Sequence, residues 1–356
     1  MDAIRRLRLA HITLEPEYRR YYPAGESSAH VVGLTDIDDM GLEGIELTFE
    51  NSLRGEAGSK TVLRDREGRI VDDLDYGRAP RFGSDLHLSI DSRLQYIAYR
   101  ELKSAVIGHG AKSGSLIMVD VKSGEILALV NQPSFNPNGP INQREPTRNR
   151  VVTDFYNPGS TIKPFTAMAA LESGRYKSET MIETSPGYFW VDNKMIQDPV
   201  NLNTITLAEA IQKSSQVAIA KVALDLPRDA VFDVLQRSGL GDYVGTGLPG
   251  EVTGLFSNVG MQSRVSRTAM AYGYGFTVTP LQLASAYVAL AGHGSRLPLS
   301  ILKQDRMPEP QQVFDAEDAR EVIAMMERVT QRGGTATNAD IDDYRVAGKT
   351  GTARVL

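Results

Sequence analysis

The pattern of hydrophobic and polar positions changes near residue 83. Residues 1–82 are rich in polar residues, glycines and charges. From Gly83 onward the apolar residues become periodic. Leu86 to Ile90 alternates as a strand does. Asp91 then precedes apolar residues at helical spacing, Leu94, Ile97 and Leu102, and we expect it to cap a helix. The pattern predicts an accessory module over 1–82 and a second domain over 83–356.

Strong turn signals divide the next segment. Two apolar runs, Ser115 to Asp120 and Glu125 to Val130, are joined by Val121-Lys122-Ser123-Gly124, which predicts a β-hairpin. The stretch from Pro133 to Arg150 is rich in Asn and Pro, so we expect a surface loop. In the accessory module, Glu43 to Leu53 is compatible with a short helix, and Asp65 to Arg69 forms a charged turn between strands.

Helices are predicted through much of the remainder. Pro158-Gly159 interrupts the chain, and Lys163 to Glu172 holds good helix formers before Gly174. Thr206 to Glu209 has the form of a capping box, and opens a further helix. Gly239 to Gly254 is glycine-rich, but no Lys-Ser/Thr pair follows, so these glycines favour plain turns over a phosphate cradle.

The last elements before the end of the chain are a helix and a strand. Asp315 precedes an amphipathic run through Val322, Met325, Met326 and Val329, and Gly333-Gly334 is expected to end this helix. Tyr344 to Val355 alternates in the manner of a strand and carries Lys349. Together the elements predict an α+β fold with an antiparallel sheet flanked by helices.

Composition narrows the class of protein. The net charge of −5 argues against nucleic acid as a partner, because phosphate binding needs concentrated basic surface. The short basic segment Arg5 to Arg8 is interpreted as solvated. No stretch approaches the roughly 20 apolar residues of a membrane helix. There is no cysteine. The histidines show no metal-ligand spacing, so we expect neither a metal nor a cofactor; they are His11, His30, His87, His109 and His293.

Three short motifs predict a serine site. The first is Ser160-Thr161-Ile162-Lys163, the second Ser214-Ser215-Gln216 and the third Lys349-Thr350-Gly351-Thr352. A second Ser-x-x-Lys at Ser300 to Lys303 lacks such context and is interpreted as surface sequence. Taken alone, Ser160 would be a helix cap beside a solvated lysine, and Ser214 a polar kink between helical segments. The other motifs in order favour the catalytic interpretation.

Each residue type suits one role in acyl transfer. A serine hydroxyl needs a base, and Lys163 would serve once burial and a nearby cation, Lys349, lower its pKa. Ser214 would relay a proton to a leaving amine. Gln216 would offer its amide to a substrate peptide group. Hydroxyls and an ammonium form a receptor for a substrate carboxylate, which predicts a binding role for the third motif. The backbone amides of Ser160 and Thr352 are a candidate oxyanion hole.

These motifs and their surroundings resemble class B penicillin-binding proteins, most closely the division-specific septal transpeptidases. The resemblance covers nearly the whole chain, and further segments that carry it are 18–25, 41–49, 149–154, 158–161, 247–251, 272–275 and 279–282. It implies an N-terminal pedestal or dimerisation domain and a penicillin-binding transpeptidase domain. It also implies attack by Ser160 on a D-Ala-D-Ala stem peptide of peptidoglycan, and covalent trapping by β-lactams.

The resemblance also implies surroundings and partners. Family members act at the periplasmic face of the inner membrane with a septal glycosyltransferase and other division proteins. They carry a membrane anchor before this segment and further strands and a helix after it, so we expect the C-terminal part of the sheet to be missing here. The family usually has Asn where Gln216 stands. A weakly active paralogue that serves as a scaffold or β-lactam-binding decoy, and a D,D-carboxypeptidase, stay open as alternatives.

Overall fold

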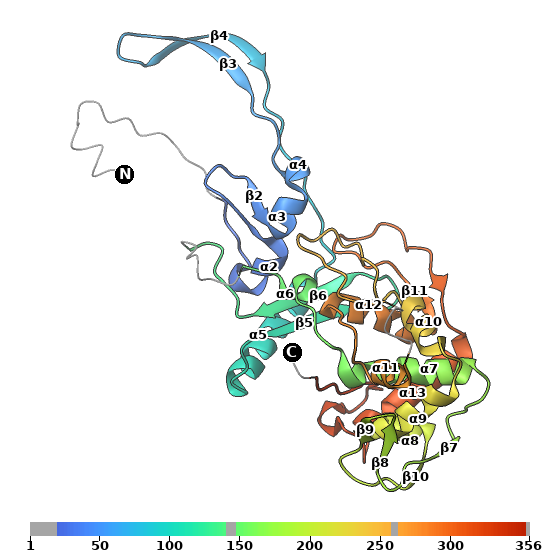
Figure 1. Ribbon diagram of the computed structural model, residues 1–356. Coiled ribbons are helices and arrows are strands. Elements are labelled where there is room, and N and C mark those ends of the chain that lie inside the picture. The colour runs from blue at the N-terminus through green and yellow to red at the C-terminus, as the bar shows by residue number, and fades with distance from the viewer. Residues whose placement is uncertain (1–19, 140–146, 258–262, 354–356) are drawn as a thin grey trace.

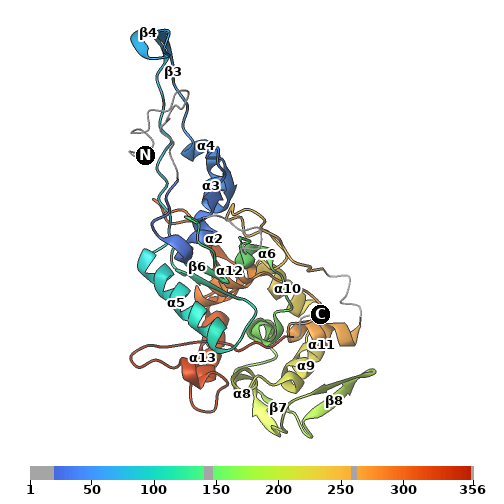
Figure 2. The same ribbon diagram turned by 90° about the vertical axis from the view of Figure 1, so that its left-hand side faces the viewer.

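A computed structural model describes residues 20–139, 147–257 and 263–353 of the chain. A narrow N-terminal part rises from a larger body of helices, and a long hairpin projects from its far end (Figures 1 and 2). Arg5 to Arg8 lie outside the described residues. Within those ranges, the structure contains no helix long and apolar enough to cross a membrane.

The N-terminal part is built from short elements. They are η1 (Gly25–Ser27), α2 (Ala29–Val32), β1 (Leu34–Thr35), β2 (Gly41–Glu43), α3 (Gly44–Thr48), α4 (Glu50–Leu53), β3 (Ser59–Arg64) and β4 (Ile70–Arg78). The predicted helix over Glu43 to Leu53 forms as two helices that meet at Phe49. The charged turn at Asp65 to Arg69 joins β3 and β4, as predicted; the Asp65 carboxylate accepts hydrogen bonds from the amides of Glu67 and Arg69.

Polar contacts fasten the N-terminal part to the body. The Gln95 side chain donates to the Ser27 carbonyl at 2.7 Å and to the Leu129 carbonyl at 2.8 Å. Because Gln95 is buried and belongs to the body, these bonds fix η1 against the sheet. Farther along, the Thr48 hydroxyl donates to the carbonyl of Gly247 at 2.9 Å.

An antiparallel hairpin supports one side of the body. It consists of β5 (Gly114–Val119) and β6 (Ile126–Gln132), and the predicted turn joins them. Helix α5 (Ser92–Gly108) begins where predicted, since the Asp91 carboxylate accepts from the amides of Arg93 and Leu94. One face of β6 packs on α5 and the other on α12 (Pro280–Ala291), because successive strand residues point to opposite faces.

The helical core lies beside this hairpin (Figure 1). Lys163 begins α7, Thr206 caps α8 with the predicted capping box, and Asp315 caps α13 as predicted. The helices of this half are α6 (Arg150–Thr153), η2 (Gly159–Ile162), α7 (Lys163–Glu172), α8 (Leu207–Gln212), α9 (Gln216–Asp225), α10 (Ala230–Arg237), α11 (Arg264–Ala271), α13 (Ala316–Thr330) and η4 (Thr337–Ala339).

Further strands form short antiparallel pairs beside the helical core. They are β7 (Met181–Glu183) with β10 (Thr204–Thr206), β8 (Tyr188–Val191) with β9 (Lys194–Gln197), and β11 (Ser295–Arg296) with β12 (Gln311–Gln312). The β8–β9 hairpin leads directly into Asp198, a residue on which the site depends.

Two predicted strands are wrong. Leu86 to Ile90 forms a single bridge, Leu88 with Leu302, and the Ser89 hydroxyl bonds the carbonyls of Ile126 and Ser300. Residues 344–353 form no ladder with any described strand. That segment is held by separate bonds instead, the Gly348 amide to the Met326 carbonyl and the Thr330 hydroxyl to the Val346 carbonyl. Alternation alone does not make a strand, because a strand also needs a partner edge.

Candidate active site

Ser160 lies at the start of a buried helix. It belongs to the single 3-10 turn η2, which passes directly into α7. In a 3-10 turn the side chains of residues i and i+3 eclipse, so Ser160 and Lys163 share one face. The Ser160 side chain is half-buried, and none of the described residues hydrogen-bonds its hydroxyl. The hydroxyl is therefore available to an incoming group.

Lys163 is a wholly buried cation. Its side chain is 0% exposed in the middle of the helical core. The ammonium nitrogen donates to the Ser214 carbonyl at 2.5 Å and lies 3.1 Å from the Ser214 hydroxyl oxygen. Because the described ion pairs leave Lys163 without a carboxylate partner, burial disfavours its charged form.

Ser214 occupies the break between α8 and α9. Its φ is +57°, in the left-handed region that residues other than glycine seldom adopt. Its amide bonds to the carbonyl of Ile211 at 3.2 Å, which closes the turn. The strained backbone aims both the carbonyl and the hydroxyl at Lys163. The turn that separates α8 from α9 therefore also carries the contacts with Lys163.

Lys349 completes the cluster from the other side. Its ammonium donates to the Ser214 hydroxyl at 2.8 Å and to the Thr350 carbonyl at 3.0 Å. The hydroxyls of Thr350 and Thr335 lie 2.9 Å apart. The Ser214 hydroxyl therefore stands between two amines, in the position that proton exchange between them requires.

The two lysines have lowered pKa values. Burial, and second the charge of Lys349, lower the pKa of Lys163 to about 7, while the nearby Asp198 opposes the change. Burial lowers the pKa of Lys349 to about 8. A substantial fraction of Lys163 is consequently neutral near pH 7 and able to accept a proton.

Close backbone packing fixes the third motif against the first. A Cβ on Gly351 would lie 2.8 Å from the Thr161 Cγ2 atom, and one on Gly159 would lie 2.9 Å from the carbonyl oxygen of Thr352. The Tyr274 hydroxyl donates to that same carbonyl at 3.2 Å. Glycine at 159 and 351 thus allows the segment bearing Thr352 to run beside Ser160.

Gly273 supports this approach from behind. It has a φ of +85°, and a Cβ there would lie 2.0 Å from the carbonyl oxygen of Gly159. The amide of Gly159 donates to the Gly273 carbonyl at 2.9 Å. The Tyr287 hydroxyl donates to the Thr161 carbonyl at 2.7 Å, and burial raises the pKa of this phenol. Both contacts hold the turn that carries Ser160.

Gln216 and Asp198 belong to one arrangement at the start of α9. The Asp198 carboxylate, 9% exposed, accepts from the Ser215 hydroxyl at 2.5 Å, the Gln216 amide at 2.5 Å and the Val217 amide at 3.3 Å. An anion at a helix N-terminus satisfies amides that lack intrahelical partners. None of the described residues bonds the Gln216 side-chain amide, which leaves it available to a ligand.

Sequence reasoning missed three supporting residues: Asp198, Tyr287 and Thr335. They have no local signal, because their contacts join segments far apart in the sequence. Tyr274 lies in a segment that carries the resemblance, 272–275, but its contact with Thr352 was not predicted. The second Ser-x-x-Lys is separate from the site. There the Ser300 hydroxyl bonds the Leu302 carbonyl and Lys303 pairs with Glu125 at 2.8 Å.

The described residues do not include a cluster of metal ligands. Across residues 20–139, 147–257 and 263–353, no group of three His, Asp or Glu side chains could hold a metal ion. His30 is buried, and the centroid of its ring lies 5.3 Å from that of Phe135. It is far along the chain from the serine motifs. What the cluster around Ser160 offers is a nucleophile, a neutral amine and a cation.

Known protein families match both parts of the chain. The penicillin binding protein transpeptidase domain matches residues 114–356, and the penicillin-binding protein dimerisation domain matches residues 3–88. The predicted division at residues 82 and 83 falls within the second match and stays a prediction.

Individual proteins are similar over most of the chain. The Escherichia coli peptidoglycan D,D-transpeptidase FtsI is 42% identical over 99% of this chain and 60% of its own length. A probable peptidoglycan D,D-transpeptidase of Neisseria gonorrhoeae, PenA, is 41% identical over 99% of this chain and 61% of its own length. The chain thus spans about 60% of the length of these relatives.

A solved structure has the same fold. Penicillin binding protein 3 of Mycobacterium tuberculosis, complexed with aztreonam, aligns with a TM-score of 0.84 and 28% identity. The alignment covers 95% of this chain and 76% of that one. The predicted α+β fold with an N-terminal pedestal is confirmed by this match and by the two matching domains.

Proposed function

Since the chain belongs to the class B penicillin-binding protein transpeptidases, we propose that it is a serine D,D-transpeptidase of peptidoglycan that acts in the division septum. One observation carries the proposal: the Ser214 hydroxyl bonds both Lys163 and Lys349, and Lys163 follows Ser160 by one turn of the same helical segment. We infer the periplasmic face of the inner membrane as its location, and a septal glycosyltransferase and other division proteins as partners, from the likeness to FtsI.

Acylation follows from the arrangement of these groups. Neutral Lys163 takes the Ser160 proton, and the Ser160 oxygen attacks the carbonyl of the penultimate D-alanine. The amides of Ser160 and Thr352 stabilise the oxyanion, each donor contributing roughly 3 kcal/mol in the transition state. As the carbon–nitrogen bond breaks, Ser214 passes a proton to the departing amine, and an acyl-enzyme remains.

Substrate binding uses the remaining predicted residues. The Lys349 ammonium and the hydroxyls of Thr350 and Thr352 bind the terminal carboxylate, with Gly351 allowing the backbone to approach. The Gln216 side-chain amide bonds a peptide group of the substrate. β-Lactams take the same place, and their acyl-enzyme persists. The aztreonam complex of the related penicillin binding protein 3 supports this assignment.

A fluorescent penicillin tests the proposal directly. We expect a covalent adduct on the purified chain, with the mass increase of one penicillin, and its loss in Ser160→Ala. Ser300→Ala is the matched control, since it removes the serine of the other Ser-x-x-Lys and should leave the adduct intact. Absence of any adduct on the unmodified chain by intact-mass measurement would overturn the proposed function.

Product analysis distinguishes the remaining alternatives. A thioester donor given with an amine acceptor yields a cross-linked amide if the chain is a transpeptidase, and only trimmed donor if it is a carboxypeptidase. A scaffold or β-lactam-binding decoy, favoured by Gln216 in place of the usual Asn, would bind penicillin yet turn the donor over very slowly. Normal turnover would refute that alternative.

A further inference from the structure

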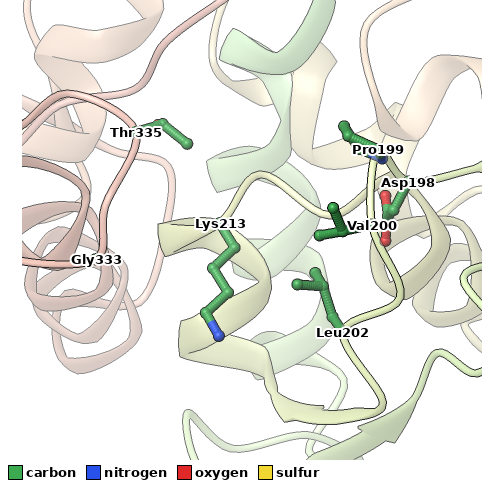
Figure 3. Close-up of a pocket in the computed structure, with 7 residues that line it drawn as sticks. All are labelled: Asp198, Pro199, Val200, Leu202, Lys213, Gly333 and Thr335. Atoms are coloured by element: carbon green, nitrogen blue, oxygen red, sulfur yellow. The ribbon is translucent and has the colours of Figure 1, made fainter.

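A cavity of about 350 Å³ adjoins the candidate active site. Figure 3 shows its walls. One wall is the segment after β9, and the other carries Gly333 and Thr335. It is lined by Asp198, Pro199, Val200, Leu202, Lys213, Gly333 and Thr335.

One chain neighbour and the hydrogen bonds of two lining residues connect this cavity to the candidate active site. Lys213 directly precedes Ser214 in the chain. Thr335 shares a hydrogen bond of 2.9 Å with Thr350. Asp198 bonds Ser215 and the amide of Gln216. The cavity is therefore a continuation of the site and not a separate surface feature.

The lining has two kinds of chemistry. Val200 is 62% exposed, and Leu202 lies beside it, so hydrocarbon lines this wall of the cavity (Figure 3). The exposed Lys213 side chain lies between the two walls, and its ammonium is at the end away from Thr335 (Figure 3). Among the described residues, none pairs with this ammonium. An apolar wall that ends in an unpaired cation suits a hydrocarbon chain bearing a carboxylate.

The position of the cavity indicates which part of the reaction it serves. Under the proposed function, Lys349, Thr350 and Thr352 bind the carboxylate of the departing D-alanine. The amine that arrives must take the place of the amine that leaves. Thr335 joins the cavity to Thr350, one of the residues assigned to that carboxylate, so the cavity adjoins the leaving-group side of the site.

We propose that this cavity is the acceptor subsite. It holds the amine-bearing residue of the second stem peptide, with its hydrocarbon chain against Val200 and Leu202 and its carboxylate on Lys213. The proposal rests on the proposed function and names the group that receives the acyl chain.

The acceptor step balances without any further reactant. The free amine attacks the acyl carbonyl of Ser160, a carbon–nitrogen bond forms, and the bond to the serine oxygen breaks. The proton lost by the amine returns to that oxygen through Ser214 and Lys163. Water competes for the same acyl-enzyme, and the ratio of amide to hydrolysed product reports on acceptor binding alone, whatever the rate of acylation.

Two matched acceptors probe the cavity. 6-Aminohexanoate has an amine and a carboxylate joined by hydrocarbon, and 6-aminohexanamide lacks only the charge. With a thioester donor, we expect the unmodified chain to favour the carboxylate. Lys213→Glu should lower the amide-to-hydrolysis ratio for 6-aminohexanoate by up to about fivefold relative to the ratio for 6-aminohexanamide, since an exposed charge pair contributes up to about 1 kcal/mol. Val200→Trp should lower the ratio for both acceptors.

Lys194→Glu makes the same charge change on β9, outside the cavity, and is the control. An unchanged ratio in both Lys213→Glu and Val200→Trp, on chains that still acylate, would overturn the acceptor proposal alone. Variants that change only the rate of acylation would also overturn the acceptor proposal. The cavity would then bind part of the donor peptide or a β-lactam side chain. If the unmodified chain forms no acyl-enzyme, the proposed function fails and the acceptor subsite fails with it.

Discussion

Replacing Lys349 with methionine removes a charge beside the base while keeping a side chain of similar length. The Lys163 and Lys349 nitrogens lie 3.1 and 2.8 Å from the same Ser214 oxygen. They are therefore within about 6 Å of each other, and at an effective dielectric constant of about 20 their charges repel by about 3 kcal/mol. That energy corresponds to a pKa change of about 2.

The repulsion disfavours the charged form of Lys163, so its removal should raise the pKa of Lys163. Burial, and second the charge of Lys349, lower the pKa of Lys163 to about 7, so Lys349→Met should raise that pKa by about the change derived above. The neutral fraction of Lys163 at pH 7 would fall from about one half to about 1%. Because acylation needs the neutral form, the acidic limb of the rate profile should move to higher pH.

The assay is the second-order rate of acylation by a chromogenic β-lactam between pH 5.5 and 10. This rate reports the pKa values of the free enzyme. Lys349→Met also loses a carboxylate contact, so the absolute rate falls and only the position of the limb is informative. Lys349→Arg keeps the charge and should leave the limb near pH 7. A limb that stays in place in Lys349→Met would refute the electrostatic reasoning.

Three further predictions concern the surroundings of the base. Asp198→Asn should move the acidic limb of the acylation profile to lower pH, opposite to Lys349→Met, because Asp198 raises the pKa of Lys163. Asp198→Ala leaves three donors unsatisfied, and should in addition lower the unfolding free energy by about 2–3 kcal/mol in a denaturant titration. Gly273→Ala should abolish penicillin labelling, since its Cβ meets the Gly159 carbonyl, whereas Gly275→Ala, at φ +87° with open space around it, should retain labelling and cost about 1 kcal/mol in thermal unfolding. Gln216→Asn should raise the second-order acylation rate, because the shorter amide restores the family's usual reach; an equal or slower rate would contradict that explanation.

Much of the fold follows from local signals in the sequence. The caps at Asp91 and Asp315 and the capping box at Thr206 place three helices because a side chain there satisfies amides a few residues away. The β5–β6 hairpin could be predicted equally well from the sequence, since its turn and its two apolar runs are adjacent in the chain. The strands predicted at 86–90 and 344–355 were wrong where they can be described, because their partners depend on segments far away in the chain.

The candidate site residues belong to short motifs in the sequence, whereas the residues that support them do not. Ser160, Ser214 and Lys349 belong to short motifs, and the structure brings them together. Asp198 has no motif, although its carboxylate fixes the start of α9 through three hydrogen bonds. The same holds for Thr335, which contacts Thr350 from a loop without regular structure. Such residues are recognised only once distant segments are placed side by side.

Ser214 shows why the supports matter to the chemistry. A serine at φ +57° is held there against a backbone preference of about 1–2 kcal/mol. The strain persists because α8 and α9 are anchored on either side, α9 through the Asp198 carboxylate. If that anchor is released, the turn can relax, and the Ser214 carbonyl and hydroxyl then no longer face Lys163. The proton path to the leaving amine therefore depends on one carboxylate that belongs to none of the three motifs.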